Sequence, residues 1–119
     1  MTVSSDNSIL VIANGSLGIS VYNIKDDRYS PAFIASYVND AFGCTFEKCA
    51  ILSDNSFIYC SCREAGLVTF QFTGTQVFPV SIYIKVGCER PLLSSDESII
   101  YVAAGFQGMV ILDNSLKYR

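Results

Sequence analysis

Three aspartates are the residues whose spacing first suggests chemistry. Asp6, Asp54 and Asp96 each follow a serine, and each precedes an apolar stretch. Carboxylates that recur in this way could bind a metal ion or act as a general acid and base. The alternative is structural, because an aspartate at the first position of a tight turn holds backbone N–H groups with its side chain. We favour the turn, and we predict no metal ligand among these residues.

The chain has no histidine. Histidine is the usual general base, the usual partner of a catalytic serine or cysteine, and a ligand in most zinc sites. The sequence also shows no glycine-rich phosphate loop between a strand and a helix. It therefore offers no candidate catalytic or cofactor-binding residue, and we predict a protein that is not an enzyme and needs no cofactor.

Five cysteines form a second group of reactive residues, and an odd number permits a reduced thiol. Cys60-Ser61-Cys62 lacks the spacing of a redox Cys-x-x-Cys pair. Cys60 occupies a repeat position that is apolar in the other copies, so we expect it in the core. Cys44 and Cys49 could form a disulfide across a long connection, whereas Cys88 has no counterpart in the repeat. Buried reduced thiols would favour a reducing compartment such as the cytoplasm.

These residues belong to a sequence repeat that is present three times. Residues 5–13 return as residues 53–61 and again as residues 95–103, each copy being a Ser-Asp turn followed by a mostly apolar run. The aspartates are 48 and then 42 residues apart. This length is typical of β-propeller blades and is too long for ankyrin or helical-pair repeats.

Four antiparallel strands are expected in each blade, numbered outward from the propeller axis. β-branched and aromatic residues dominate them, and no helical period is present. Pro31 and Pro79 are each expected to open a fourth strand, where a missing N–H costs least. The blade units are about 1–38, 39–86 and 87–119. The expected first strands are at residue 3, 49–52 and 91–93, the second at 8–13, 56–61 and 98–103, the third at 18–24, 66–72 and 108–113, and the fourth at 32–38 and 80–86.

The second strands carry the clearest packing signal. Residues 9–12 and 99–102 are apolar without alternation, which predicts burial on both faces. Stacking each small sheet between two neighbours would supply that burial, although two and a half units cannot close a ring of about four to eight blades. The predicted fold class is all-β, with consecutive four-stranded antiparallel blades of an incomplete β-propeller. We favour a piece of a larger array over a self-assembling unit or a truncated product.

The third copy resembles a known propeller-forming repeat. Residues 101–113, Tyr-Val-Ala-Ala-Gly-Phe-Gln-Gly-Met-Val-Ile-Leu-Asp, are similar to the LVIVD-type repeat, which passes through a Tyr-Val-Ala strand and a glycine hairpin into a Val-Asp strand end. Pro31 and Pro79 are similar to its later proline. Asn23 and Gln71 replace the terminal aspartate in the first two copies. The resemblance implies a cell-surface or scaffolding protein and no particular reaction.

The composition of the chain limits the kinds of partner that it could bind. Eight basic and eleven acidic residues give a net charge of -3, and the basic residues are scattered singly, so no nucleic-acid interface is expected. Apolar runs of about six residues are far too short to span a bilayer, so no membrane insertion is expected either. We predict a protein or carbohydrate partner, with self-association through open blade edges as the alternative.

Loops are the expected partner surface, because blades hold them rigidly while the core tolerates little change. The loops between second and third strands should share one rim with the connections from each fourth strand to the next blade. The candidate binding residues on that rim are Arg63, Glu64, Glu89, Arg90, Phe106 and Gln107. The leading hypothesis is a non-catalytic interaction or scaffold module. The alternatives are a segment of a larger propeller hydrolase or lactonase without its catalytic residues, and a self-assembling structural repeat.

Overall fold

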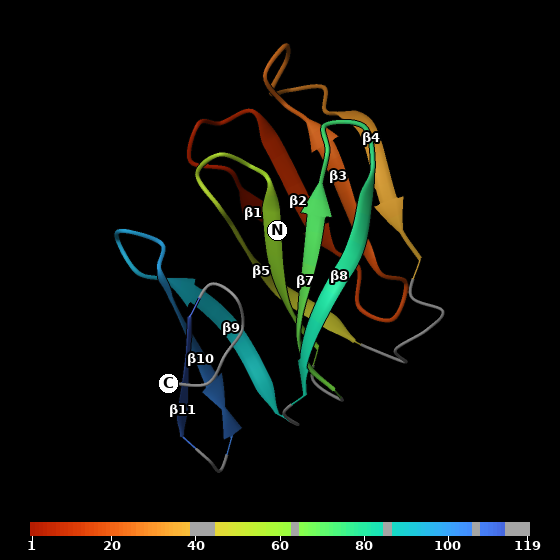
Figure 1. Cartoon of the computed structure of the whole chain (residues 1–119). Helices are drawn as coiled ribbons and strands as arrows, with labels where there is room; N and C mark the ends of the chain where they lie inside the picture. The colour runs from red at the N-terminus through yellow and green to blue at the C-terminus, as the bar shows by residue number, and fades with distance from the viewer. Residues whose placement is uncertain (39–44, 63–64, 85–86, 106–107, 114–119) are drawn as a thin grey trace.

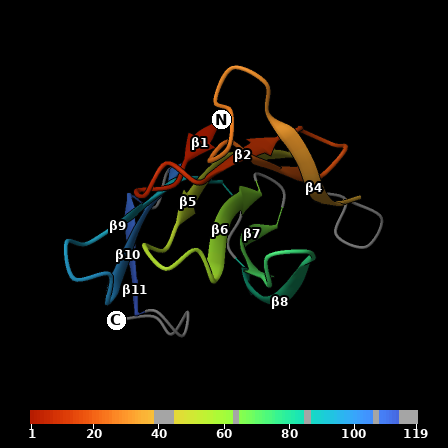
Figure 2. The ribbon, with the colours of Figure 1, turned by 90° about the horizontal axis from the view of Figure 1, so that it is seen from above.

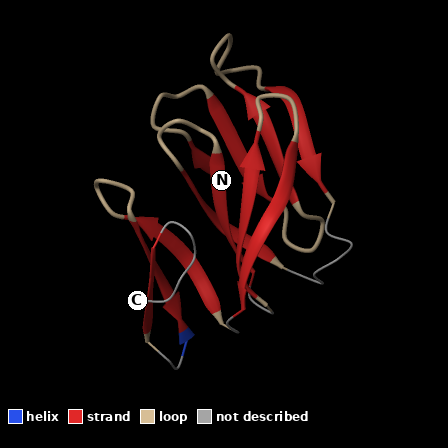
Figure 3. Ribbon diagram, viewed as in Figure 1, coloured by secondary structure: helices blue, strands red, loops and turns tan. Residues whose placement is uncertain are grey.

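The chain folds into three antiparallel sheets, drawn in Figures 1 and 3. The computed structural model describes residues 1–38, 45–62, 65–84, 87–105 and 108–113. This part contains no α-helix and no helix that could cross a membrane. The sheets have the orders β1-β2-β3-β4, β5-β6-β7-β8 and β9-β10-β11, as predicted for consecutive propeller blades. The strands are β1 (Thr2–Val3), β2 (Ile9–Ala13), β3 (Ile19–Asn23), β4 (Ala32–Tyr37), β5 (Phe46–Ile51), β6 (Phe57–Cys62), β7 (Gly66–Phe72), β8 (Val77–Ile84), β9 (Cys88–Leu93), β10 (Ile99–Ala104) and β11 (Met109–Asp113).

The innermost strands are longer than the sequence indicates. The second and third strands lie within a residue or so of their predicted positions. In contrast, β5 begins at Phe46 and β9 at Cys88, each three residues before the apolar stretch that locates the strand in the sequence. The added residues include charged ones such as Glu47 and Glu89, which a sheet accepts because backbone groups make the ladder while side chains can point to solvent.

Pro79 does not open its strand, which corrects the sequence prediction. Pro31 directly precedes β4 as expected, but Pro79 is the third residue of β8. Strand β8 is the edge of its sheet, and its pairing with β7 shifts register between Thr69 and Phe70, opposite Pro79. Edge strands and bulges are the places where a sheet tolerates a residue without an N–H.

The middle sheet, β5 to β8, lies between the other two, and the innermost strands β1, β5 and β9 are neighbours (Figures 1 and 2). One apolar cluster joins it to the first sheet and a second cluster joins it to the third. Along β6, Ile58 belongs to the first cluster and Tyr59 to the second, and both are buried. Burial on both faces is therefore confirmed for the middle sheet.

Within the residues that the structure describes, the two outer sheets are each covered on one face only. On β2, Val11 is buried against the middle sheet, while its neighbour Leu10 is half-buried. On β10, Val102 is buried and Tyr101 is half-buried. Burial on both faces, predicted for residues 9–12 and 99–102, is thus wrong for these sheets, because this chain supplies a neighbouring sheet on one side of each. We refer to the uncovered surfaces of the first and third sheets as the open faces.

Cysteine pairing also differs from the prediction. Cys49 of β5 and Cys60 of β6 form a disulfide, and Cys62 is disulfide-bonded too. Cys49 and Cys60 stand directly opposite each other in the antiparallel ladder, with Cα atoms 4.2 Å apart, so the register itself brings them together. The suggested Cys44–Cys49 disulfide is therefore wrong, although Cys60 is in the core as expected. Disulfides are typical of oxidising compartments, so the thiol argument for a reducing one loses its basis.

Candidate interaction surfaces

The three recurring aspartates cap the turns between the innermost and second strands. Oδ1 of Asp6 accepts hydrogen bonds from the backbone N–H of Ser8 at 3.0 Å and from the hydroxyls of Ser8 and Ser4, each at 2.7 Å. Asp54 and Asp96 accept the N–H of the serine two residues on, at 2.9 Å and 3.1 Å. Their interpretation as turn-forming acceptors is confirmed.

Aspartate is not the first residue of the backbone turn, however. The N–H of Asn7 donates to the carbonyl of Ser4 at 3.0 Å, which makes Ser4 the first residue and Asp6 the third. Asp6 instead begins a smaller turn that its own side chain closes with the N–H two residues on. The residue between must reverse the chain, and Asn7 has a φ of 61°. Asn55 and Glu97 occupy the equivalent position, with φ of 64° and 63°.

The side chain of this left-handed residue connects neighbouring sheets. Nδ2 of Asn55 donates to Oδ2 of Asp6 at 3.1 Å and to Oγ of Ser8 at 3.0 Å. The carboxylate of Glu97 accepts from the backbone N–H of Ser53 at 2.9 Å and from its hydroxyl at 2.7 Å. The second and third turns thus each bond to the turn of the preceding sheet, a contact that the repeat pattern alone does not indicate.

Hydrogen bonding keeps these carboxylates ionised. The hydroxyl of Ser8, with Ser4 next, lowers the pKa of Asp6 far below its ordinary value of 3.8. The hydroxyl of Ser56 lowers the pKa of Asp54 in the same way, and the backbone N–H of Ser98 lowers the pKa of Asp96 to about 2. Carboxyls with such low pKa values are poor general acids at neutral pH. In the part of the chain that the structure describes, no group of three or more His, Cys, Asp or Glu could hold a metal ion.

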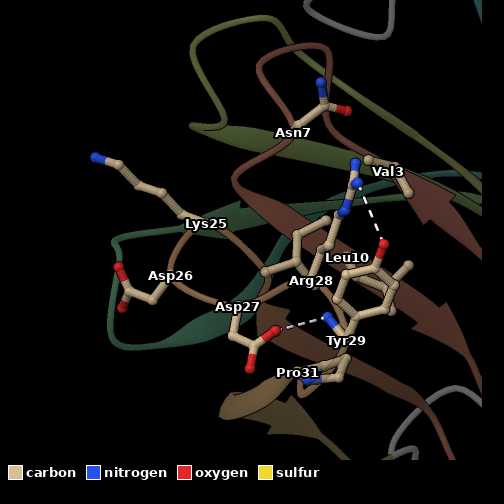
Figure 4. A pocket seen from close by; sticks show the side chains of 10 residues that line it. Val3, Asn7, Leu10, Lys25, Asp26, Asp27, Arg28, Tyr29 and Pro31 are labelled. Carbon is tan, nitrogen blue, oxygen red and sulfur yellow. Dashed lines mark hydrogen bonds between the residues drawn. The ribbon is translucent and has the colours of Figure 1, made fainter.

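The open face of the first sheet carries a groove of about 740 Å³ (Figure 4). Val3 and Leu10 supply apolar side chains from β1 and β2, while the loop after β3 supplies charged ones. In that loop Arg28 donates to the hydroxyl of Tyr29 at 3.3 Å and lies over its ring, 5.2 Å from the centroid. Asp27 accepts the N–H of Tyr29 at 2.9 Å. The groove therefore combines an apolar sheet surface with a loop that carries charges of both signs.

The open face of the third sheet carries exposed aliphatic side chains. Leu92 of β9 is 60% exposed and Met109 of β11 is 59% exposed. They line a groove of about 360 Å³ together with Arg90, Tyr101, Val102, Ala103 and Gly108. Neither open face was singled out in the sequence, because apolar residues on an uncovered strand face look the same in sequence as residues that a neighbouring sheet covers.

The six predicted rim residues divide into two groups. Glu89 and Arg90 are exposed, but they belong to strand β9 and not to the connecting loop predicted for them. Arg90 lines the groove on the open face of the third sheet. Four of the six lie outside the residues that the structure describes: Arg63, Glu64, Phe106 and Gln107.

One contact in the region of the predicted rim can be followed in detail. The N–H of Gly15 donates to the carbonyl of Phe46 at 2.9 Å, and the N–H of Phe46 donates back at 3.0 Å. Gly15 has a φ of 60°, which glycine adopts without strain. The loop between β2 and β3 therefore lies beside the start of the next sheet's innermost strand, as expected for loops and connections at one end of the blades.

This three-sheet arrangement matches solved structures of longer chains. One is provisionally assigned as a 6-phosphogluconolactonase from Bacteroides fragilis NCTC 9343, with a TM-score of 0.81 and 16% identity over 99% of this chain and 36% of that one. Another is a periplasmic gluconolactonase from Pseudomonas aeruginosa, with a TM-score of 0.78 and 14% identity over 98% of this chain and 36% of that one. The fold is that of a β-propeller segment. A functionally unknown protein from Desulfotomaculum acetoxidans DSM 771 matches the segment at a TM-score of 0.78 and 14% identity, over 99% of this chain and 40% of that one.

The propeller segment thus spans well under half the length of these structures. No family model matches the sequence, and no curated protein matches it. The predicted propeller architecture is supported, whereas the LVIVD-type assignment is not confirmed. Identities this low establish the fold and leave the activity to be argued separately.

Proposed function

We propose that this chain is a non-catalytic module that contributes consecutive blades to a β-propeller and binds further propeller sheets through its two open faces. The hypothesis of an interaction module is retained, but the binding surface moves from the rim loops to the sheets. The rim loops remain a candidate surface for a protein or carbohydrate partner.

The observation that carries this proposal is the burial of equivalent residues in successive sheets. Met109 occupies the repeat position of Leu67, yet Met109 is 59% exposed and Leu67 is fully buried. Tyr101 corresponds to Tyr59, which the third sheet covers to 2% exposure. Burying side chains of this size stabilises a protein by roughly 1.5 to 3 kcal/mol each. An open face that presents them is therefore an association surface.

The same comparison of burial between equivalent residues can be made for the first sheet and the middle-sheet face that it covers. Leu10 and Ile12 occupy the positions of Ile58 and Cys60, which the first sheet covers completely. In the first sheet, Leu10 and Ile12 are only half-buried. Each open face thus carries side chains equivalent to those that pack between two sheets elsewhere in the chain. The described residues supply no further sheet to cover them.

Methionine oxidation tests the proposal, because the chain has only two methionines. Met109 should react readily with hydrogen peroxide in the isolated chain at high dilution. It should react at least about tenfold more slowly in the protein purified from its native source, where further sheets cover the open face. Met1, which is 83% exposed, gives the rate of an uncovered methionine in the isolated chain. Equal oxidation rates for Met109 in the two preparations would contradict the proposal.

The structural neighbours favour a second candidate, a segment of a propeller lactonase. Two of those proteins carry gluconolactonase names. Hydrolysis of gluconolactone, with and without added divalent cations, separates the candidates. Under our proposal the protein purified from its native source hydrolyses the lactone no faster than buffer. Hydrolysis by that protein, but not by the isolated chain, would establish the second candidate instead.

A further inference from the structure

Asn7 occupies a position that makes an inter-sheet hydrogen bond in both other turns. Asn55 donates to Asp6 and Ser8 of the preceding sheet, and Glu97 accepts from Ser53 in the turn of the sheet that precedes its own. Asn7 has the same left-handed backbone, but its side-chain amide has no hydrogen-bond partner within the described residues. It lines the groove on the open face of the first sheet (Figure 4). A donor is thus placed where the turn of a preceding sheet would lie.

The matching acceptors are at the opposite end of the chain. Asp96 and Ser98 repeat the Asp-x-Ser arrangement to which Asn55 binds in the first sheet. Oδ1 of Asp96 accepts from Ser98 and Ser94, whereas its Oδ2 accepts no hydrogen bond within the described residues. Ser98 is exposed, while its counterpart Ser8, next to Asn55, is half-buried. The third sheet therefore presents the acceptor half of the junction that the first two sheets form.

We infer that two copies of this chain associate head to tail, with the open face of the third sheet of one copy on the open face of the first sheet of the next. Nδ2 of Asn7 from the second copy donates to Oδ2 of Asp96 and Oγ of Ser98 in the first, as Asn55 does at the internal junction. Met109 packs against the apolar surface around Val3. This inference rests on the proposed function and adds the occupant, a second copy, because donor and acceptors of matching types lie within one sequence.

The contact is heterologous, because the two open faces are different surfaces. Each copy that uses its third sheet still presents its first sheet, so association continues until a ring closes or a longer array forms. A two-fold symmetric dimer would instead pair like faces, so Asn7 of one copy would not lie opposite Asp96 of the other. The two arrangements therefore respond differently to substitutions on a single face.

Mixing two blocked variants tests this arrangement. Val3→Lys blocks the first sheet and Met109→Lys blocks the third, both at exposed positions. We expect the unaltered chain to sediment as multiples of 13.0 kDa with increasing concentration and each variant to sediment as a monomer. An equimolar mixture should form a 1:1 dimer, because one intact face of each kind remains. Val80→Lys, at an exposed position on the outer strand β8, is the matched control and should associate like the unaltered chain.

A second pair of variants tests the hydrogen bond and does not touch the apolar surface. Asn7→Asp places a carboxylate opposite Asp96 and should weaken association by about tenfold. Adding Asp96→Asn restores a donor and an acceptor with their places exchanged, so the double variant should recover most of the loss. Circular dichroism of the unmixed variants verifies that each is folded. A double variant that associates no better than Asn7→Asp would overturn the proposed pairing.

Three results would overturn the inference as a whole. They are a chain that stays at 13.0 kDa at all concentrations, a Met109→Lys variant that still associates, and a mixture of blocked variants that forms no dimer. The proposed function has a separate outcome. A monomeric chain whose Met109 is protected in the native protein by further sheets of a longer polypeptide would exclude the second copy and leave the proposed function in place.

Discussion

Leu67 and Met109 occupy the same repeat position in neighbouring sheets, so truncating each to alanine separates the effect of packing from that of sequence. Leu67 is fully buried in the cluster between the middle and third sheets. Leu67→Ala removes carbon atoms worth roughly 0.8 kcal/mol each and leaves a cavity, which gives a loss of about 3 kcal/mol. Met109→Ala on an open face should cost less than about 0.5 kcal/mol. Ile19→Ala, at the same position in the first sheet and 1% exposed, should match Leu67→Ala.

Urea unfolding followed by far-ultraviolet circular dichroism measures all three variants. With an m value of about 1.5 kcal/mol/M, a loss of about 3 kcal/mol lowers the midpoint by about 2 M. The experiment needs a dilution at which the chain is monomeric, because association would also bury Met109. A loss below about 1 kcal/mol for Leu67→Ala, or equal losses for Leu67→Ala and Met109→Ala, would refute the face-to-face packing.

In the same urea assay Thr69→Val should raise the free energy of unfolding by about 1 kcal/mol, because the buried Thr69 hydroxyl makes no hydrogen bond among the described residues. No gain would show that the hydroxyl has a partner. Glu97→Ala should lower the free energy of unfolding by about 1 kcal/mol by removing both bonds to Ser53, and Glu97→Gln should lose less. An equal loss for both would contradict a role for the carboxylate. The lowered pKa values of Asp6 and Asp96 stabilise the folded state above pH 3.8, and this contribution is lost as pH falls toward about 2. The free energy of unfolding should therefore decline below about pH 4, less steeply in Asp96→Asn, and a pH-independent free energy would refute this.

The strand order could be predicted because local features mark each strand end. A Ser-Asp turn precedes the second strand of each sheet. A glycine lies at the start of the third strand, as Gly66 does in β7. The unbroken apolar runs at residues 9–12 and 99–102 predicted that sheets pack on sheets, which is correct for one face of each outer sheet and, through Ile58 and Tyr59, for both faces of the middle sheet. These features involve residues that are close together in the sequence, so they can be recognised in a single sequence without knowledge of the structure.

Contacts between segments far apart in the chain were the features that could not be predicted. Cys49 pairs with Cys60 because of a register that includes a shift between Phe46 and Cys49. The bond from Asn55 to Asp6 crosses 49 residues and depends on the left-handed backbone at Asn55. The open faces depend on which sheets stack on each other in space. In each case the deciding information is the spatial arrangement of the strands, and a repeat alignment does not contain it.

Amide hydrogen exchange tests the central claim most directly, because it reports protection strand by strand. At a dilution where the chain is monomeric, the amides of β6 and β7 should exchange most slowly, since the middle sheet is covered on both faces. Amides of β2 and β10, in sheets covered on one face, should exchange faster. If β10 were as strongly protected as β6 in the monomer, or if β6 exchanged as fast as the edge strand β4, the stacked-sheet account with two open faces would be wrong.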